Sequence, residues 1–122
     1  MNIRFTALMT TLILSVFFSI SASADVVEVD GIYYDISETT ATVTDGDNEY
    51  SGDIVIPESI TYENSKYSVT SIGECAFASC FSLTSITYNG TQSQWNKISK
   101  ASSWKNNSAI KTITCTDGVI TL

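Results

Sequence analysis

The stretch that decides the fold is residues 69–86, which read VTSIGECAFASCFSLTSI. Its first part ends in Ile72-Gly73, and glycine suits a tight turn directly after a strand. Its last part continues to Tyr88 as an alternating run that stops at the turn signal Asn89-Gly90. Between them, residues 74–80 are expected to form a short compact turn of at most two helical turns. We therefore expect a strand, a compact turn and a second strand.

The residues that precede this stretch predict β-strands joined by tight turns. Residues 26–36 hold two short apolar runs around Asp30-Gly31, a pair that tolerates positive φ at both positions of a type I′ hairpin turn. A further hairpin is expected around Asn64-Ser65. Residues 25–69 are therefore expected to form a β-meander without a helix. Short apolar or alternating runs that end in turn or strand-breaking residues recur at 41–46, 54–57 and 60–69.

The residues that follow the stretch predict one short helix and a closing hairpin. Thr91 can cap a helix that carries Trp95 and Ile98 on one face, because residues three apart lie on the same side of a helix. Residues 110–116 alternate as a strand, and Asp117-Gly118 then turns the chain into its last apolar run.

Residues 1–24 have the pattern of a secretory signal peptide. Residues 7–20 are uncharged and mostly apolar, and Ala22-Ser23-Ala24 is a small-residue cleavage pattern. The apolar run is shorter than the roughly 20 residues that a transmembrane helix needs. We therefore expect a secreted protein, periplasmic, cell-surface or extracellular, cleaved between Ala24 and Asp25 and with no membrane span afterwards.

The charged residues after this leader exclude several classes of function. They comprise 13 acidic residues and five Lys, with no Arg and no His. Ser-His and Cys-His catalytic pairs and His-ligated metals are thereby excluded, and an acidic chain is a poor ligand for nucleic acid. We expect no enzyme activity and no cofactor. Net charge is −11 over residues 25–74 and +3 over 75–122, which indicates either a solvated acidic face or a patch that meets a basic partner.

Residues 69–86 resemble one unit of the BspA-like leucine-rich repeat family, found on secreted and surface proteins of bacteria. The family pattern T-S-I-G-x-x-A-F-x-x-C-x-x-L-T-S-I is matched at every fixed position from Thr70 to Ile86. Residues 29–34 and 52–57 resemble the β-rich segment that often precedes such repeats, and 89–118 resembles the segment that often follows them.

The resemblance implies a mainly β fold with a β-meander or hairpin N-terminal segment, a single short leucine-rich-repeat-like solenoid rung, and a C-terminal cap with one short helix and a β-hairpin. Ile54 and Ile86 would be equivalent strand positions. They lie 32 residues apart, where the family keeps about 23, and the excess of about nine residues (61–69) is assigned to a hairpin insertion. The chain thus holds one complete unit. The implied domains are a signal peptide (1–24), an N-terminal β-rich cap (25–67), the repeat unit (68–90) and a C-terminal helix-plus-hairpin cap (91–122). The implied repeat core is Ile72, Ala76, Phe77, Cys80, Leu83 and Ile86.

Two groups of residues could hold a metal or a disulfide. The cysteines are Cys75, Cys80 and Cys115; an odd count leaves one over, and Cys80 and Cys115 fit small core positions better than a bridge. The acidic run 45–49, joined by Asp53, resembles part of a calcium loop but lacks its length, and an exposed turn is the alternative. We expect no metal.

The candidate ligand contacts are aromatic, because exposed Tyr and Trp are common anchors of interfaces. The resemblance implies a non-enzymatic protein-binding or adhesion module whose partner is an unknown protein or glycan, with host extracellular matrix as one candidate. A truncated repeat protein with a structural or self-association role is the alternative, and a carbohydrate-binding module is the third. The candidate contact residues are Tyr33, Tyr34, Tyr62, Tyr67 and Trp104.

Overall fold

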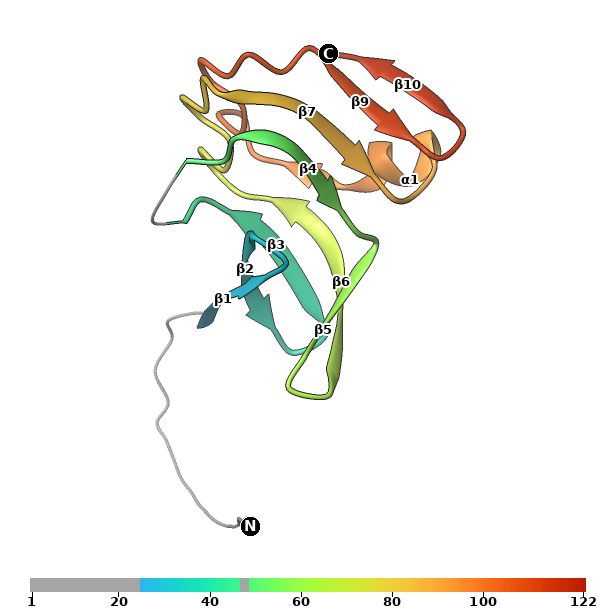
Figure 1. The fold of residues 1–122 in the computed structure, drawn as a ribbon. Helices are drawn as coiled ribbons and strands as arrows, with labels where there is room; N and C mark the ends of the chain where they lie inside the picture. Colours follow the sequence, from blue (N-terminus) through green and yellow to red (C-terminus); the bar gives the residue numbers. More distant parts are fainter. Residues whose placement is uncertain (1–24, 47–48) are drawn as a thin grey trace, which may run out of the picture.

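The computed structural model describes residues 25–46 and 49–122, and the chain is mainly β there, with ten strands and one short helix (Figure 1). The signal peptide expected at residues 1–24 lies outside the described residues. Within the described part, no helix is both long and apolar enough to cross a membrane.

The first sheet starts with three antiparallel strands, β1 (Asp25–Val29), β2 (Ile32–Ser37) and β3 (Thr40–Thr44). Asp30 and Gly31 have φ values of 51° and 84°, and these positive values fit the type I′ turn predicted between β1 and β2. The hairpin predicted at this end of the chain is confirmed.

The meander predicted for residues 25–69 is wrong beyond β3. Strand β4 (Gly52–Ile56) belongs to a second sheet, and the hairpin of β5 (Ser59–Tyr62) and β6 (Ser65–Ile72) returns so that β6 lies parallel to β3. The chain leaves the first sheet through the connection after β3 and returns to it through Pro57-Glu58 after β4, where proline cannot continue the strand ladder. Apolar alternation along a strand does not reveal which of these connections carries the chain to a new sheet.

Two predicted turns lie one residue earlier than expected. The β5–β6 turn is Glu63-Asn64, whose φ values are 49° and 67°, because Tyr62 pairs with Ser65. The last hairpin pairs Cys115 with Gly118, so its turn is Thr116-Asp117. In the first case Asn64 takes the second turn position, where a positive φ is again required.

Each sheet contains a ladder of three parallel strands. In the first sheet β3, β6 and β8 (Ser99–Lys100) lie side by side, and in the second β4, β7 (Leu83–Tyr88) and β9 (Thr112–Cys115) do so. Ile54 pairs with Ile86, as the sequence predicted, and Ile86 pairs with Ile113. Strand β10 (Gly118–Thr121) completes the second sheet beside β9. The chain thus passes between the two sheets repeatedly, and the core lies between them (Figure 1).

The core is rich in aromatic side chains that stack along the ladders. The ring centroids of Tyr50 and Phe77 lie 5.2 Å apart, and those of Phe77 and Trp104 lie 6.1 Å apart. The backbone also connects these layers, because the Phe77 N–H donates to the Trp104 carbonyl. All six residues of the implied repeat core are buried: Ile72, Ala76, Phe77, Cys80, Leu83 and Ile86.

The predicted short helix is α1 (Gln92–Lys97), and it begins at the expected cap. The Thr91 hydroxyl accepts a hydrogen bond from the Gln94 N–H, and the Gln94 side chain accepts one from the Thr91 N–H. This capping box satisfies two backbone donors at the start of the helix. Trp95 and Ile98 are both buried, so the helix turns the face predicted for them toward the core.

Candidate functional site

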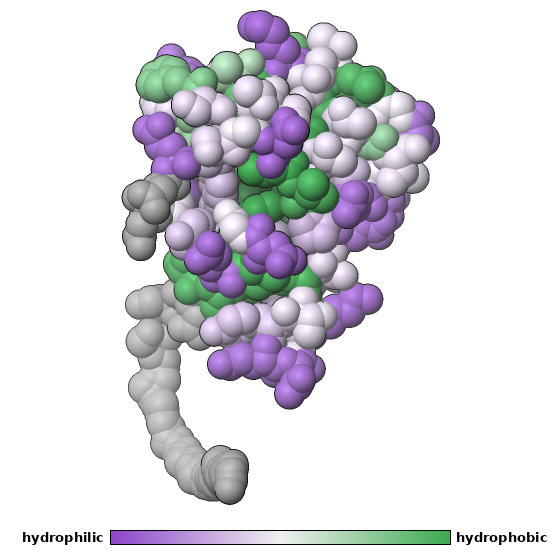
Figure 2. Space-filling model, viewed as in Figure 1, coloured by the Kyte–Doolittle hydropathy of each residue, from purple (hydrophilic) through white to green (hydrophobic). Residues whose placement is uncertain are grey.

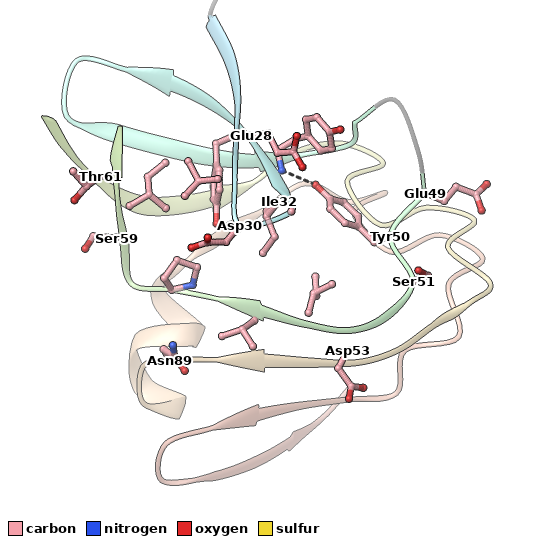
Figure 3. Close-up of a pocket in the computed structure, with 18 residues that line it drawn as sticks. Glu28, Asp30, Ile32, Glu49, Tyr50, Ser51, Asp53, Ser59, Thr61 and Asn89 are labelled. Atoms are coloured by element: carbon pink, nitrogen blue, oxygen red, sulfur yellow. Dashed lines mark hydrogen bonds between the residues drawn. The ribbon is translucent and has the colours of Figure 1, made fainter. Parts of the chain in front are cut away.

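A cleft of about 850 Å³ opens between the β1–β2 hairpin and strand β4. Figure 3 shows the hairpin on one side, β4 on the other, and Ser59 and Thr61 of β5 at one end. In Figure 2 apolar residues are visible in the hollow of the molecule, between hydrophilic residues at its margins. The cleft therefore combines an apolar floor with a polar rim, as ligand-binding clefts commonly do.

The type I′ turn places Asp30 at the mouth of the cleft. Asp30 is exposed, and its carboxylate points into the space between the hairpin and β5 (Figure 3). Glu28 pairs with Tyr33 across the hairpin, and both line the cleft. The tight turn thus brings two carboxylates and one aromatic ring to the same wall.

Tyr50 ties the wall formed by β2 to the segment that leads into β4. Its hydroxyl donates to the Thr44 carbonyl over 2.6 Å and accepts from the Tyr33 N–H over 3.0 Å. Burial raises the pKa of Tyr50 to about 12, and the hydrogen bond from Tyr33 opposes that rise. The phenol is therefore neutral at physiological pH, and its two hydrogen bonds hold this part of the cleft in place.

The hydroxyl of Tyr34 has no hydrogen-bond partner, although the side chain is fully buried at 0% exposure. Tyr34 also lines the cleft. Burial raises its pKa above the ordinary range of tyrosine, and the negative charge of Asp30 adds to the effect. A buried polar group without a partner costs roughly 1–3 kcal/mol. The hydroxyl is therefore an unpartnered polar group buried behind the lining of the cleft.

The charge of the cleft is negative. Glu28, Asp30 and Glu49 line it and are exposed, and no Lys is among the lining residues. Asp53 lines it with its backbone, but its carboxylate points away (Figure 3) and accepts hydrogen bonds from Ser85 and Thr84 on β7. These hydrogen bonds lower the pKa of Asp53. Asp30 points into the cleft and Glu49 points outward from it (Figure 3), and with no counter-charge in the lining these acids favour a cationic ligand.

The predicted aromatic contacts divide into buried and accessible residues. Trp104 is buried at 8% exposure in the aromatic core, so the structure contradicts its role as a surface contact. Tyr34 is buried as well, its hydroxyl oxygen included, so the structure contradicts its role as a surface contact too. Tyr33 is half-buried and lines the cleft, whereas Tyr62 and Tyr67 pack against the core on the β5–β6 hairpin outside it. Sequence pattern could not separate these cases, because a tyrosine on either face of a strand satisfies the same alternation.

The cysteines and acidic residues form no metal site in the described residues. Cys80 and Cys115 are buried and free, and Cys75 is exposed and free. Burial raises the pKa of the Cys80 and Cys115 thiols, which keeps them protonated. Residues 47–48 of the acidic run 45–49 lie outside the described residues. In the rest of the described chain no three His, Cys, Asp or Glu side chains lie close enough together to hold an ion.

Two features of the site escaped the sequence pattern. The rim acids Glu28, Asp30 and Glu49 come from three separate segments of the sequence, and no single motif groups them. Only the fold brings them to one cleft. Strand β8 and the parallel pairing of β9 with β7 were also missed, although β9 was expected as a strand and a spacing of 27 residues could have revealed its pairing. Buried residues recur at that spacing in three pairs: Leu83 and Ile110, Ile86 and Ile113, and Tyr88 and Cys115.

Comparisons with known proteins leave the function to be inferred from the site itself. No protein-family model matches the chain, and searches of curated proteins and of solved structures found no match either. The acidic cleft beside β4 and the repeat-like sequence at residues 69–86 are therefore the two observations from which a function can be argued.

Proposed function

We propose that this protein is a secreted, non-enzymatic protein-binding module of the BspA-like type, and that its cleft takes a basic segment of a protein partner. The observation that carries the proposal is the acidic, tyrosine-bearing cleft between the β1–β2 hairpin and β4. Its three exposed carboxylates have no basic neighbour in the lining, and its apolar floor offers contact area that a small cation would leave unused.

The arrangement of the strands supports the family resemblance. The strands β3, β4, β6, β7, β8 and β9 alternate between two parallel ladders, and this alternation would fit the path of a short solenoid with each pair of strands as one coil. The loop around Phe77 stacks on the loop around Trp104 through backbone hydrogen bonds, as neighbouring coils of a solenoid do. In this interpretation the repeat unit at 68–90 is the middle coil, and the segments on either side contribute a partial coil each.

The cleft would recognise its partner through charge and shape. Glu28, Asp30 and Glu49 would meet Lys or Arg side chains at the rim, where each exposed ion pair contributes roughly 0.2–1 kcal/mol. Burial of apolar groups against Ile32 and Ile54 would add affinity at the floor. Rim charges act mainly on the association rate, so salt should weaken binding.

Binding of the purified protein to an array of extracellular-matrix proteins and glycans, followed by titration of each hit by surface plasmon resonance, tests the proposal. We expect saturable binding to proteins with exposed Lys- or Arg-rich segments. The double variant Glu28→Gln with Asp30→Asn should weaken binding about five- to tenfold, since two rim ion pairs are lost. Asn at position 30 keeps the positive φ of the turn, because Asn adopts that conformation readily.

The matched control is Glu74→Gln, which removes one exposed acid outside the cleft lining and should leave affinity unchanged. The proposal is wrong if no array member binds saturably, or if the double variant and the control bind alike. An obligate oligomer in light scattering, unaffected by the cleft variants, would favour self-association instead.

A further inference from the structure

The two sheets end unequally at the start of the chain. Beyond β3 the first sheet continues with β2 and then β1, whereas the second sheet stops at β4 (Figure 1). Among the described residues β4 pairs with β7 on one edge, and its other edge has no strand partner. Such an edge carries unpaired N–H and C=O groups that can accept another strand.

The cleft occupies the space beside this free edge. Residues of two strands line it: Ile54 and Val55 of β4, and Ile32, Tyr33 and Tyr34 of β2. In the first sheet β2 is the next strand beyond β3. A strand paired with β4 would therefore lie opposite β2, as β4 itself lies opposite β3. The cleft is thus the place of the next strand of the second sheet.

We propose that the basic partner segment binds as an added β-strand, pairing its backbone with the free edge of β4. The inference rests on the proposed function, because it specifies how the partner of that same cleft is held. Strand β4 has five residues, Gly52–Ile56, which at about 3.3 Å per residue gives an edge of roughly 16 Å. A segment of about five residues therefore fills it.

The side chains around the edge specify the chemistry of the segment. Successive residues of a strand point to opposite faces, so an added strand would direct every second side chain inward, toward Ile32 and Tyr34. Those side chains should be apolar. The alternate side chains point away from β2, and there the net charge of −11 over residues 25–74, rather than contact with one rim acid, favours Lys or Arg.

The same charges argue against a second copy of this chain as the occupant. Two β4 edges that paired with each other would bring Glu28, Asp30 and Glu49 of one copy close to the same three acids of the other. Like charges at such separations repel, and few cations are available nearby to offset them, since residues 25–74 carry one Lys against 12 acids. A partner with alternating basic and apolar residues avoids this repulsion.

The test uses heptapeptides with lysine at alternate positions and varied apolar residues between, together with a matched library that carries glutamate in place of lysine. The strongest binder is then resynthesised in two forms, each N-methylated at alternate backbone amides. N-methylation removes N–H donors but keeps every side chain and charge. We expect one methylated form to lose at least tenfold in affinity and the other to bind as before, because only one set of amides faces β4.

Hydrogen exchange provides the second measurement. Amide protons of β4 that face the cleft should exchange at least tenfold more slowly when the unmethylated peptide is bound, while those of β10, a free edge remote from the cleft lining, should be unchanged. Strand addition is overturned, and the proposed function stands, if lysine peptides bind but both methylated forms bind equally and β4 exchange does not slow. If no lysine peptide binds better than its glutamate counterpart, the proposed function and the inference both fail.

Discussion

The two ends of the strand ladders differ in whether a polar side chain within them has hydrogen-bond partners. At the end of the chain, the Lys100 amino group donates to the carbonyls of Trp95 and Ile98 over 2.9 and 2.8 Å and lies 4.7 Å from the Trp95 ring centroid. Near the start of the chain, the Tyr34 hydroxyl has no partner. The polar group at one end thus has its hydrogen-bond partners within the protein, whereas the hydroxyl at the other end has none.

Strand pairing and charge follow the same division. Strand β10 forms the edge of the second sheet at the far end, with α1 packed near it, whereas β4 forms the edge at the other end and borders the cleft. The acidic residues gather in the half that contains β4. We therefore expect the end with the aromatic core and α1 to contribute more to stability, while the end with β4 borders the cleft that we propose as the ligand site.

The largest expected effect comes from disrupting the end with the aromatic core. Trp104→Ala removes an indole that packs against both Phe77 and Trp95, so we expect a loss of about 3–5 kcal/mol in the free energy of unfolding. Ile54→Ala, on the floor of the cleft, should cost less than half as much, because Ile54 is already partly exposed. Urea unfolding followed by circular dichroism measures both.

The control for these substitutions is Phe81→Ala, since Phe81 is 70% exposed and its loss should change stability little. If Trp104→Ala unfolds the chain entirely, Trp104→Phe gives a measurable intermediate value. Equal losses for Trp104→Ala and Ile54→Ala would contradict the contrast between the two ends.

A smaller effect is expected from raising the pH. Burial raises the pKa of Tyr50 from 10.0 to about 12, so the folded state holds this proton where the unfolded state has released it. The contribution of Tyr50 to stability is therefore constant below pH 10 and is lost between pH 10 and pH 12, by about 3 kcal/mol, and burial of Tyr34 and Tyr88, which raises their pKa as well, adds to the decline. Urea midpoints measured from pH 8 to pH 12 test this, and Tyr50→Phe should flatten the decline.

Tyr62→Phe is the control, because this tyrosine lies on the outer β5–β6 hairpin and its substitution should leave the alkaline decline intact. The assignment to Tyr50 is wrong if the two variants and the unmodified protein lose stability in parallel.

The smallest effects are expected from deleting one polar group at each end, and the two changes in stability should have opposite signs. Lys100→Met should lower stability by about 1–2 kcal/mol, because two hydrogen bonds from a charged donor and the contact with Trp95 are lost. Tyr34→Phe should raise stability by about 1 kcal/mol, because it removes an unpartnered buried hydroxyl. Thermal unfolding by calorimetry compares the two.

The outcome that would remove the contrast is a loss of stability in both variants, which would mean that the Tyr34 hydroxyl already has a partner in the folded protein, such as an ordered water.

Local features of the fold could be predicted from the sequence because they depend on neighbouring residues. The Asp30-Gly31 turn, the Thr91 cap and the end of β4 before Pro57 each follow from the conformational limits of one or two residues. The equivalence of Ile54 and Ile86 also followed, from the resemblance of their surroundings, and the two residues pair directly. Partners distant in the chain did not follow when the sequence offered no repeated motif, as in the parallel pairing of β3 with β6.

Most of the candidate site depends on contacts between distant parts of the chain and could not be predicted from local sequence. The aromatic residues at 33 and 34 were identified as candidate contacts, but which one is buried depends on the face of β2 that meets the core. The acids of the rim come from β1, the Asp30-Gly31 turn and the acidic run before β4, and no local signal indicates that they line one cleft. Trp104 was misassigned because an aromatic residue in a polar loop gives the same pattern whether its ring points out or in.

By itself, the sequence determined that this chain is mainly β, where its hairpin turns lie and that its acids precede its lysines, because these properties depend on backbone preferences and composition. Only the tertiary structure decided that the strands form two parallel ladders, that Tyr34 is buried with its hydroxyl unpaired, and that β4 borders an acidic cleft. Long-range pairing is chosen by the packing of the whole core, and no single segment contains that information.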